Sequence, residues 1–227
     1  MLKITVYDNE STDGTRELAR RLGCSVHTMV TNASLSDSAY LQVKNEAWKK
    51  SSADWVLMVD ADEWIDVWPQ DLAAYETANV TAVKTKGIYL VWPTDTLDLS
   101  EEAHGVWDVK EWDASHGLPP VHLYDKPSLY YKSAMKEIGM APGGHEASPQ
   151  GRVKWLSETR TPAPRLYHAK YYDAGSMMAR YEKYRLRMSD ENKKNGWGVY
   201  TTTPSELITK QFEYLRNSSR PLPWRVW

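Results

Sequence analysis

Carboxylate side chains crowd the end of an apolar run in WVLMVDADEW, residues 55–64. Asp60 and Asp62 are separated by one residue, so in an extended backbone both side chains lie on the same side. Adjacent carboxylates repel each other, and a divalent cation removes that penalty. Hard oxygen ligands suit Mg²⁺ or Mn²⁺, and Mg²⁺ is commonly held by one or two carboxylates together with substrate phosphates. The pattern predicts a divalent-ion site, and the alternative is a solvated acidic turn without a ligand.

The segments before these carboxylates predict alternating strands and helices. Residues 2–8 and 25–31 are rich in β-forming residues, and the run at 55–59 is typical of a parallel strand covered on both faces. Helices are expected over residues 16–23 and from about 36 to 50. This order predicts an α/β protein with right-handed crossovers and a mainly parallel sheet.

In such a sheet, ligands bind beyond the carboxyl ends of the strands, which share one edge. Asp8 follows the first predicted strand and Asp60 follows the third. Both aspartates are therefore expected to face the same cleft.

Three segments in this order resemble the GT-A glycosyltransferases of family 2. DNESTDGT (8–15) is similar to the family's DNxSTDGT-like loop, and VLMVDADEW resembles its apolar strand ending in D-x-D-E. VKNEAW (43–48) is similar to the R-N-x-A segment, with lysine replacing arginine. The resemblance covers about the first third of the chain. It implies the GT-A fold, a mainly parallel mixed sheet flanked by helices, and a metal-dependent transfer of a sugar.

The resemblance further implies the substrates. The donor would be a nucleotide-diphosphate sugar, with UDP-sugars favoured, and the acceptor a hydroxyl of a glycan or glycoprotein, with inversion at the sugar. Residue by residue, it assigns nucleotide contacts to Asp8, Asp13, Lys44 and Asn45.

The remaining donor residues are also assigned by resemblance. Asp60 would approach the ribose or a metal-bound water, and Asp62 would bind the Mn²⁺ or Mg²⁺ that bridges the diphosphate. PRLYHAKYYDAGS (164–176) resembles the family's H-Y-x-x-x-S segment, in which His168 would complete the metal site and Lys170 would reach a phosphate. A structural histidine at a strand end is the alternative.

An inverting transferase needs a base that deprotonates the acceptor hydroxyl. Glu146, next to His145 in GGHEAS, falls where the family often carries this carboxylate, and the glycines before it permit close approach of a ligand. Asp113 competes for the role, as do Glu111 and Asp108, although each fits an ordinary surface carboxylate as well.

Most aromatic residues are of the two types that carry a polar group on the ring, with 11 Trp and 14 Tyr against one Phe. Flat rings with a polar edge suit sugar stacking, but they also fill cores. Trp107 and Trp112 either stack on the acceptor sugar or only close their loop.

Helices are predicted over residues 173–195 and from about 203 to 217. We therefore expect a catalytic core over residues 1–175 and a helical extension over 176–227 packed on it, as one domain overall.

Composition restricts the partners. The formal net charge of −2 supplies no broad positive field for a nucleic acid. Cys24 is the one cysteine and cannot form an internal disulfide, and no apolar run reaches membrane-spanning length. A cytoplasmic protein without nucleic-acid or membrane partners is expected.

The chain departs from the family at its start, because the first strand and helix that usually precede the DNxSTDGT loop are missing. Either the chain is an unusually compact form or it is a fragment. Compact forms resemble enzymes of large algal viruses that glycosylate their own capsid protein, which would place the chain in the host cytoplasm. Two other classes stay open: an inactive, carbohydrate-binding transferase-like module, and a Mg²⁺-dependent nucleotidyltransferase or phosphohydrolase.

Overall fold

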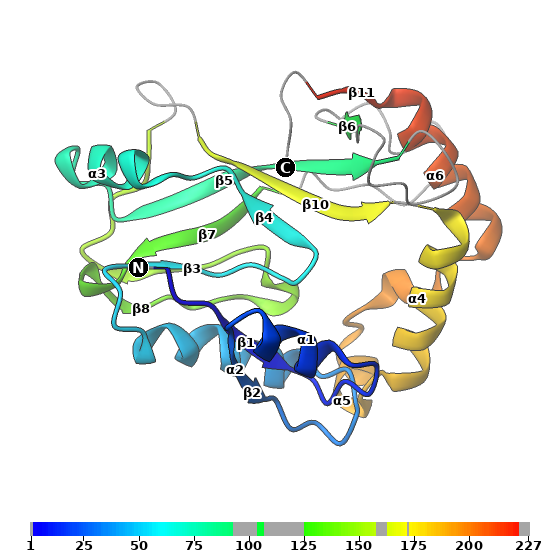
Figure 1. Ribbon diagram of the computed structural model, residues 1–227. Coiled ribbons are helices and arrows are strands. Elements are labelled where there is room, and N and C mark those ends of the chain that lie inside the picture. The colour runs from blue at the N-terminus through cyan, green and yellow to red at the C-terminus, as the bar shows by residue number, and fades with distance from the viewer. Residues whose placement is uncertain (1, 93–103, 107–124, 158–162, 172, 223–227) are drawn as a thin grey trace.

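The computed structural model describes residues 2–92, 104–106, 125–157, 163–171 and 173–222 (Figure 1). Five of the candidate site residues lie outside these ranges: Trp107, Asp108, Glu111, Trp112 and Asp113. The described elements are, in chain order, β1 (Thr5–Asp8), α1 (Thr15–Arg21), β2 (Ser25–Thr28), α2 (Asp37–Glu46), η1 (Ala47–Lys50), β3 (Trp55–Leu57), β4 (Glu63–Ile65), α3 (Pro69–Thr77), β5 (Ala82–Val91), β6 (His104–Val106), β7 (Lys126–Tyr131), η3 (Lys132–Ala134), β8 (Met135–Glu137), η4 (Pro142–Gly144), β9 (Gln150–Gly151), β10 (Arg165–Tyr171), α4 (Ala174–Arg187), α5 (Asp190–Asn195), η5 (Val199–Thr202), α6 (Ser205–Ser218) and β11 (Arg220–Pro221).

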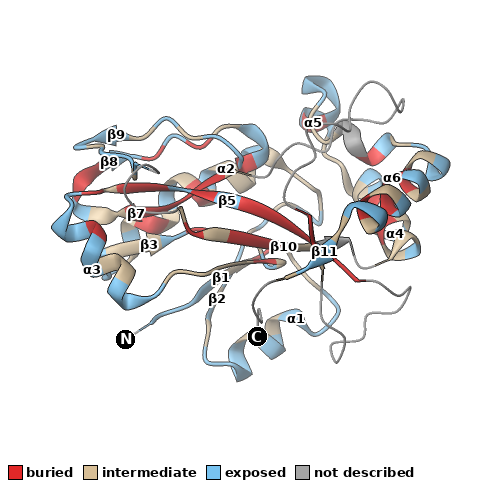
Figure 2. Ribbon diagram, turned by 90° about the horizontal axis from the view of Figure 1, so that it is seen from above, coloured by how far each residue is buried: buried red, intermediate tan, exposed pale blue. Residues whose placement is uncertain are grey.

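The first three elements form the parallel unit that the sequence predicts. β1 and β2 pair in parallel, with Thr5 opposite Ser25, and α1 connects them. α1 begins after Gly14, whose φ of 83° is a left-handed conformation that glycine adopts without a Cβ penalty. None of the α1 residues is buried (Figure 2), so this helix covers little of the core.

The larger sheet differs from the predicted one. β3 pairs with β7, β7 with β5, β5 with β6 and β6 with β11, and all four pairings are antiparallel. β10 joins β5 in parallel on its other edge, and β4 joins β10 antiparallel. β1 and β2 form a separate two-stranded sheet. The predicted GT-A fold with a central parallel sheet is therefore wrong: the chain has a mixed α/β fold whose main sheet is antiparallel.

The error has a physical reason. An apolar run indicates a strand covered on both faces and carries no information on the direction of its neighbours. In β3, Val56 lies opposite Tyr130 of β7, a strand that comes much later in the sequence. Most residues of β5 are buried (Figure 2), so a strand with antiparallel neighbours in this protein can also be covered on both faces.

Helices at the C-terminal end cover one end of the main sheet. Met177 and Tyr181 of α4 pack with Phe212 and Leu215 of α6 against Tyr89 of β5. Each such buried side chain contributes about 1.5–3 kcal/mol relative to an exposed one. The boundary expected between residues 175 and 176 falls inside α4.

The predicted helix over 173–195 is divided into α4 and α5. Asp173 caps α4 by accepting the backbone N–H of Ser176, and Ser189 caps α5 by accepting that of Asn192. Among the described residues, none of the helices combines the length and the apolar character that crossing a membrane requires.

Candidate functional site

Asp60 lies in the turn between β3 and β4, and lysines engage both of its carboxylate oxygens. Lys44 Nζ lies 2.9 Å from Oδ1, and Lys126 Nζ lies 2.8 Å from Oδ2. The Tyr40 hydroxyl donates to Oδ1 at 3.0 Å. Burial alone would raise the pKa of Asp60, but the two ammonium groups more than offset it and hold this pKa far below its usual range. Asp60 is therefore ionised and bound by cations of the protein itself.

Glu63 and Lys126 form the buried part of this network. Both oxygens of Glu63 lie 2.9 Å from Lys126 Nζ, and Glu63 Oε2 also accepts the backbone N–H of Asp60 at 2.8 Å. Both side chains are 0% exposed. Because buried charges persist only when they are paired and hydrogen-bonded, this network holds the turn at residues 60–63 in one conformation.

Asp62 has different partners. Its Oδ2 atom lies 3.4 Å from His168 Nε2, and Arg180 Nη1 donates to it at 3.1 Å. The pairing of β4 with β10 brings these groups together, because His168 lies opposite Glu63 in that ladder. Burial would raise the pKa of Asp62, but the hydrogen bond with His168 and the charges of His168 and Arg180 lower it overall. With its side chain 33% exposed, Asp62 presents a carboxylate beside an imidazole at a point that solvent reaches.

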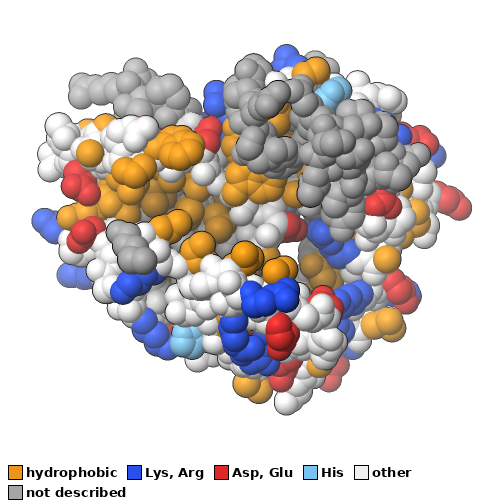
Figure 3. Space-filling view, in the orientation of Figure 1, with side chains coloured by type: hydrophobic (Ala, Val, Ile, Leu, Met, Phe, Trp, Pro, Cys, Tyr) orange, Lys and Arg blue, Asp and Glu red, His pale blue; other side chains and the backbone are white. Residues whose placement is uncertain are grey.

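α4 connects this point to the loop after β1. Arg187 Nε donates to the carbonyl of Ala33 at 2.7 Å, and its Nη2 donates to that of Asn9 at 3.3 Å. Arg180, Tyr184 and Arg187 are spaced by four and three residues, which places them on one helix face. In Figure 3, Lys and Arg side chains gather around a hollow bordered by β4, α1 and α4.

Tyr184 lies between the two arginines on this face. Burial raises the pKa of its hydroxyl, and the carboxylates of Asp60 and Asp62 raise it further, whereas Arg180 and Arg187 lower it. The phenol is therefore within electrostatic reach of both aspartates.

The loop after β1 satisfies its own polar groups. Asp8 is buried, at 4% exposure, and accepts the backbone N–H of Ser11 at 3.0 Å. Asp13 accepts both the hydroxyl and the backbone N–H of Thr15, at 2.6 and 3.2 Å, and these bonds lower the pKa of Asp13. Asp8 ends β1 and Asp60 follows β3, and these strands belong to different sheets, contrary to the shared sheet edge that the sequence predicted.

Lys44 and Asn45 of α2 were predicted to line the nucleotide. In the structure, both side chains contact other parts of the chain. Lys44 is 7% exposed and holds Asp60; burial lowers the pKa of Lys44 although Asp60 raises it. The side-chain oxygen of Asn45 accepts the backbone N–H of Met140 at 2.8 Å. Asn45 thereby ties α2 to the loop at residues 139–148.

The loop at 139–148 carries His145 and Glu146, both exposed. Gly144 precedes them at a φ of +69°, and a Cβ there would lie 2.6 Å from the Tyr40 hydroxyl. Since Tyr40 also bonds to Asp60, this loop is joined to the acidic turn through one side chain.

Replacing Gly144 with alanine is expected to detach Tyr40 from Asp60. Gly23→Ala is the matched control, because Gly23 also has a positive φ, +81°, but no atom within 4 Å of an added Cβ. We expect Gly23→Ala to lower the free energy of unfolding by about 1–2 kcal/mol because of the backbone conformation alone. Gly144→Ala should lose about 1 kcal/mol more, since a hydrogen bond to a charged group is also broken. Urea unfolding measures the free energy of unfolding of both variants. Equal losses would contradict the close contact between residue 144 and Tyr40.

Several members of the site were not predicted from the sequence, among them Lys126, Arg180 and Arg187. Lys126 begins an apolar strand, and nothing in KPSLYY indicates a buried ammonium group. The spacing of Arg180 and Arg187 on a predicted helix was a usable signal, because it places both on one face. Lys170, which was predicted to reach a phosphate, lies in β10, and its side chain is outside what the structure describes.

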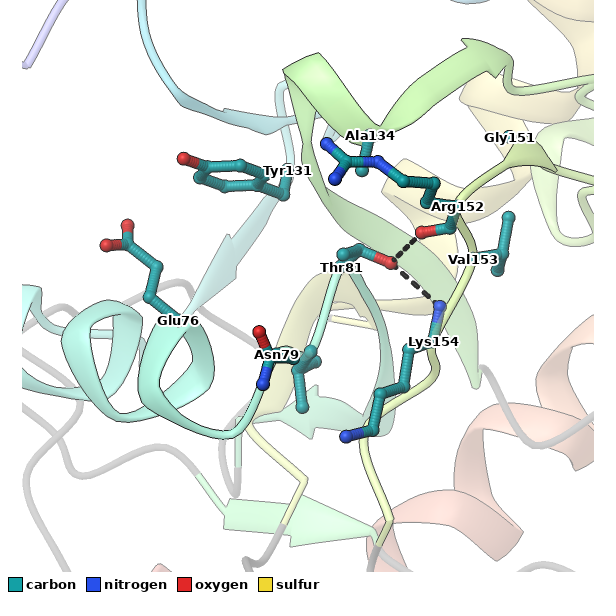
Figure 4. A pocket seen from close by; sticks show the side chains of 10 residues that line it. Glu76, Asn79, Thr81, Tyr131, Ala134, Gly151, Arg152, Val153 and Lys154 are labelled. Carbon is teal, nitrogen blue, oxygen red and sulfur yellow. Dashed lines mark hydrogen bonds between the residues drawn. The ribbon is translucent and has the colours of Figure 1, made fainter.

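A cavity of about 570 Å³ lies elsewhere in the molecule (Figure 4). Its lining includes Glu76, Tyr131 and Arg152, and Thr81 bonds to the backbone of the segment that carries Lys154. It adjoins Tyr131, at the opposite end of β7 from Lys126, and none of the predicted site residues lines it. This cavity is therefore separate from the candidate site.

The donor set at Asp62 allows a test of whether a divalent ion fits. Across the part of the chain that the structure describes, no group of three or more His, Cys, Asp or Glu side chains is arranged to hold a metal. Asp62 and His168 supply two donors 3.4 Å apart, and neighbouring ligands of a six-coordinate ion lie about 3 Å apart when each bond is about 2.1 Å. Two protein ligands suffice when phosphates and water complete the shell, so Asp62 and His168 fit such an ion if Arg180 moves. Asp60 is less suited, because lysines occupy both of its oxygens.

Comparison with protein-family models and with curated proteins gives no match.

Proposed function

We propose that the protein is a metal-dependent glycosyltransferase that uses a nucleotide-diphosphate sugar as donor. One observation carries the proposal: Asp62, His168 and Arg180 meet at one partly exposed point. A carboxylate and an imidazole suit a divalent ion, and a guanidinium suits a phosphate. The proposal rests on these side chains and on the sequence motifs, and it does not depend on a GT-A fold.

In this proposal, Asp62 and His168 would hold the ion, and the diphosphate of the donor would bind beside them. When bound, the ion supplies positive charge that stabilises the nucleoside diphosphate as it leaves. Arg180 would add a second positive charge beside the oxygen atoms of the diphosphate. The Asp60 network does not touch the donor diphosphate and keeps the turn that carries Asp62 in place.

The acceptor is a hydroxyl of a glycan or glycoprotein, and Glu146 is the proposed base. Glu146 is exposed, and Gly144 of the same loop lies against Tyr40, which contacts the acidic turn. An exposed carboxylate in this loop supports the choice of Glu146, because a base must be open to the incoming hydroxyl.

The direct test is incubation with UDP- and GDP-sugars and Mn²⁺, followed by separation of the nucleotide products. We expect slow release of nucleoside diphosphate without an acceptor, because water substitutes poorly for the acceptor hydroxyl. Release of pyrophosphate or inorganic phosphate would indicate a nucleotidyltransferase or phosphohydrolase. Binding without any release would indicate a carbohydrate-binding module.

Glu146→Ala is expected to retain donor binding and to lower sugar transfer about 100-fold, since general base catalysis typically contributes at least that factor. Glu137→Ala is a suitable control, because Glu137 is also exposed and lies in β8, outside the loop. Transfer is measured with the donor that the product assay identifies. Unchanged transfer in the Glu146 variant would move the base to the segment that contains Asp113.

A further inference from the structure

We propose that Arg180 is the diphosphate-binding residue of the site and that it occupies the Asp62 oxygen until a divalent ion takes its place. This inference rests on the proposed function for the identity of the donor. It adds a residue that the sequence did not single out, and it adds an order of events: Arg180 leaves Asp62 and then binds the diphosphate.

The first step of the argument is the geometry at Asp62. Arg180 Nη1 donates to Oδ2 at 3.1 Å, and the same oxygen lies 3.4 Å from His168 Nε2. An ion held by Asp62 and His168 would need this oxygen, and two cations cannot share it at close range without strong repulsion. Arg180 therefore competes directly with a divalent ion.

The second step is the position of Arg180 on its helix. Its side chain is 21% exposed, and Met177 and Tyr181 anchor the flanking turns of α4 in the core. The helix backbone is thus fixed, and a change of the Arg180 rotamer would not require the helix to move. A guanidinium released from Asp62 would stay close to that carboxylate, next to a diphosphate bound there.

The third step is the rest of the α4 face. Arg187 ties the face to the carbonyls of Asn9 and Ala33, and Tyr184 lies between the arginines. Seven residues of helix span about 10.5 Å, which is long enough for a diphosphate and the sugar attached to it. A guanidinium binds two oxygens of one phosphate. In this proposal the ion would hold one phosphate and Arg180 would bind the other, so the two together favour a diphosphate over a single phosphate.

The test compares wild type with Arg180→Gln, and Arg185→Gln is the matched control. Arg185 lies on the same helix, is exposed, and pairs with Glu182 at the surface. Mn²⁺ affinity is measured by electron paramagnetic resonance of the free ion. Inorganic pyrophosphate and orthophosphate are then titrated calorimetrically at saturating Mn²⁺, so that no nucleoside base needs to be chosen.

We expect Arg180→Gln to bind Mn²⁺ alone about 5- to 50-fold more tightly, because its competitor is gone. The same variant should bind pyrophosphate about 10- to 100-fold more weakly, with orthophosphate little affected. Arg185→Gln should match wild type in all three titrations.

Unchanged or weaker Mn²⁺ binding in Arg180→Gln would overturn the competition, and so would absence of Mn²⁺ binding to the wild type. Unchanged pyrophosphate affinity would overturn the diphosphate role. If both expected changes occur but the wild type releases no nucleoside diphosphate from any sugar nucleotide, the diphosphate site stands and the transferase proposal fails.

Discussion

Lys126→Met is expected to lower the free energy of unfolding by about 3–5 kcal/mol, the range for breaking a buried ion pair by removing one partner. Lys126 Nζ contacts Asp60 at 2.8 Å and Glu63 at 2.9 Å, and its side chain is 0% exposed. Methionine fills a similar volume, but it leaves the carboxylates of Asp60 and Glu63 without the Lys126 ammonium group in poorly solvated surroundings. Urea unfolding followed by tryptophan fluorescence measures the loss.

Lys86→Met provides the matched control. Lys86 pairs with Asp125 at 2.9 Å, but its side chain is 48% exposed, so the loss should stay below about 1 kcal/mol. Similar losses at Lys86 and Lys126 would show that burial of the network does not matter to stability.

The difference between wild type and Lys126→Met should also depend on pH. Lys44 and Lys126 lower the pKa of Asp60 in the folded protein below the value of about 3.9 found in unfolded chains. Stability from this carboxylate is therefore complete above about pH 4 and is lost as the pH falls further. The two proteins should accordingly differ most at neutral pH and converge in acid.

Asp62→Ala is expected to abolish cation-dependent binding of the sugar nucleotide. The substitution removes the carboxylate that, with His168, supplies both proposed protein ligands, and imidazole alone holds Mg²⁺ or Mn²⁺ poorly. Calorimetric titration of the donor with and without Mn²⁺ measures the effect. The proposed ion site is wrong if this variant keeps wild-type affinity.

A control for charge alone is Asp190→Ala. Asp190 pairs with Lys193 at the first turn of α5, and its side chain is fully exposed. Donor binding by this variant should match wild type, whereas Asp62→Asn should behave like Asp62→Ala because a neutral amide is a weak ligand for a hard cation.

The sequence predicted much of the local structure. The β1–α1–β2 unit is parallel, α2 lies within the helix expected from about residue 36 to 50, and the C-terminal helices are present. Alternation, caps and turn residues encode these features within a few positions of each other, so they can be read without knowledge of the fold.

The architecture of the main sheet could not be predicted in the same way. β3 finds its partner in β7, and β5 contacts β10 and β7, strands that lie far apart in the chain. Resemblance of the acidic motifs to a parallel α/β family suggested the wrong neighbours, because similar strand ends occur beside different partners.

For the candidate site, the sequence by itself determined that carboxylates follow an apolar strand and that His168 lies in a later strand, whereas the expected burial of the apolar strand is wrong, because no residue of β3 is buried. Only the tertiary structure decided their roles, since it gives Asp60 two lysines and leaves Asp62 beside His168 and Arg180. Residue type fixes what a side chain can do chemically. Which charge neutralises it, and whether solvent reaches it, depends on side chains brought in from distant parts of the chain by folding.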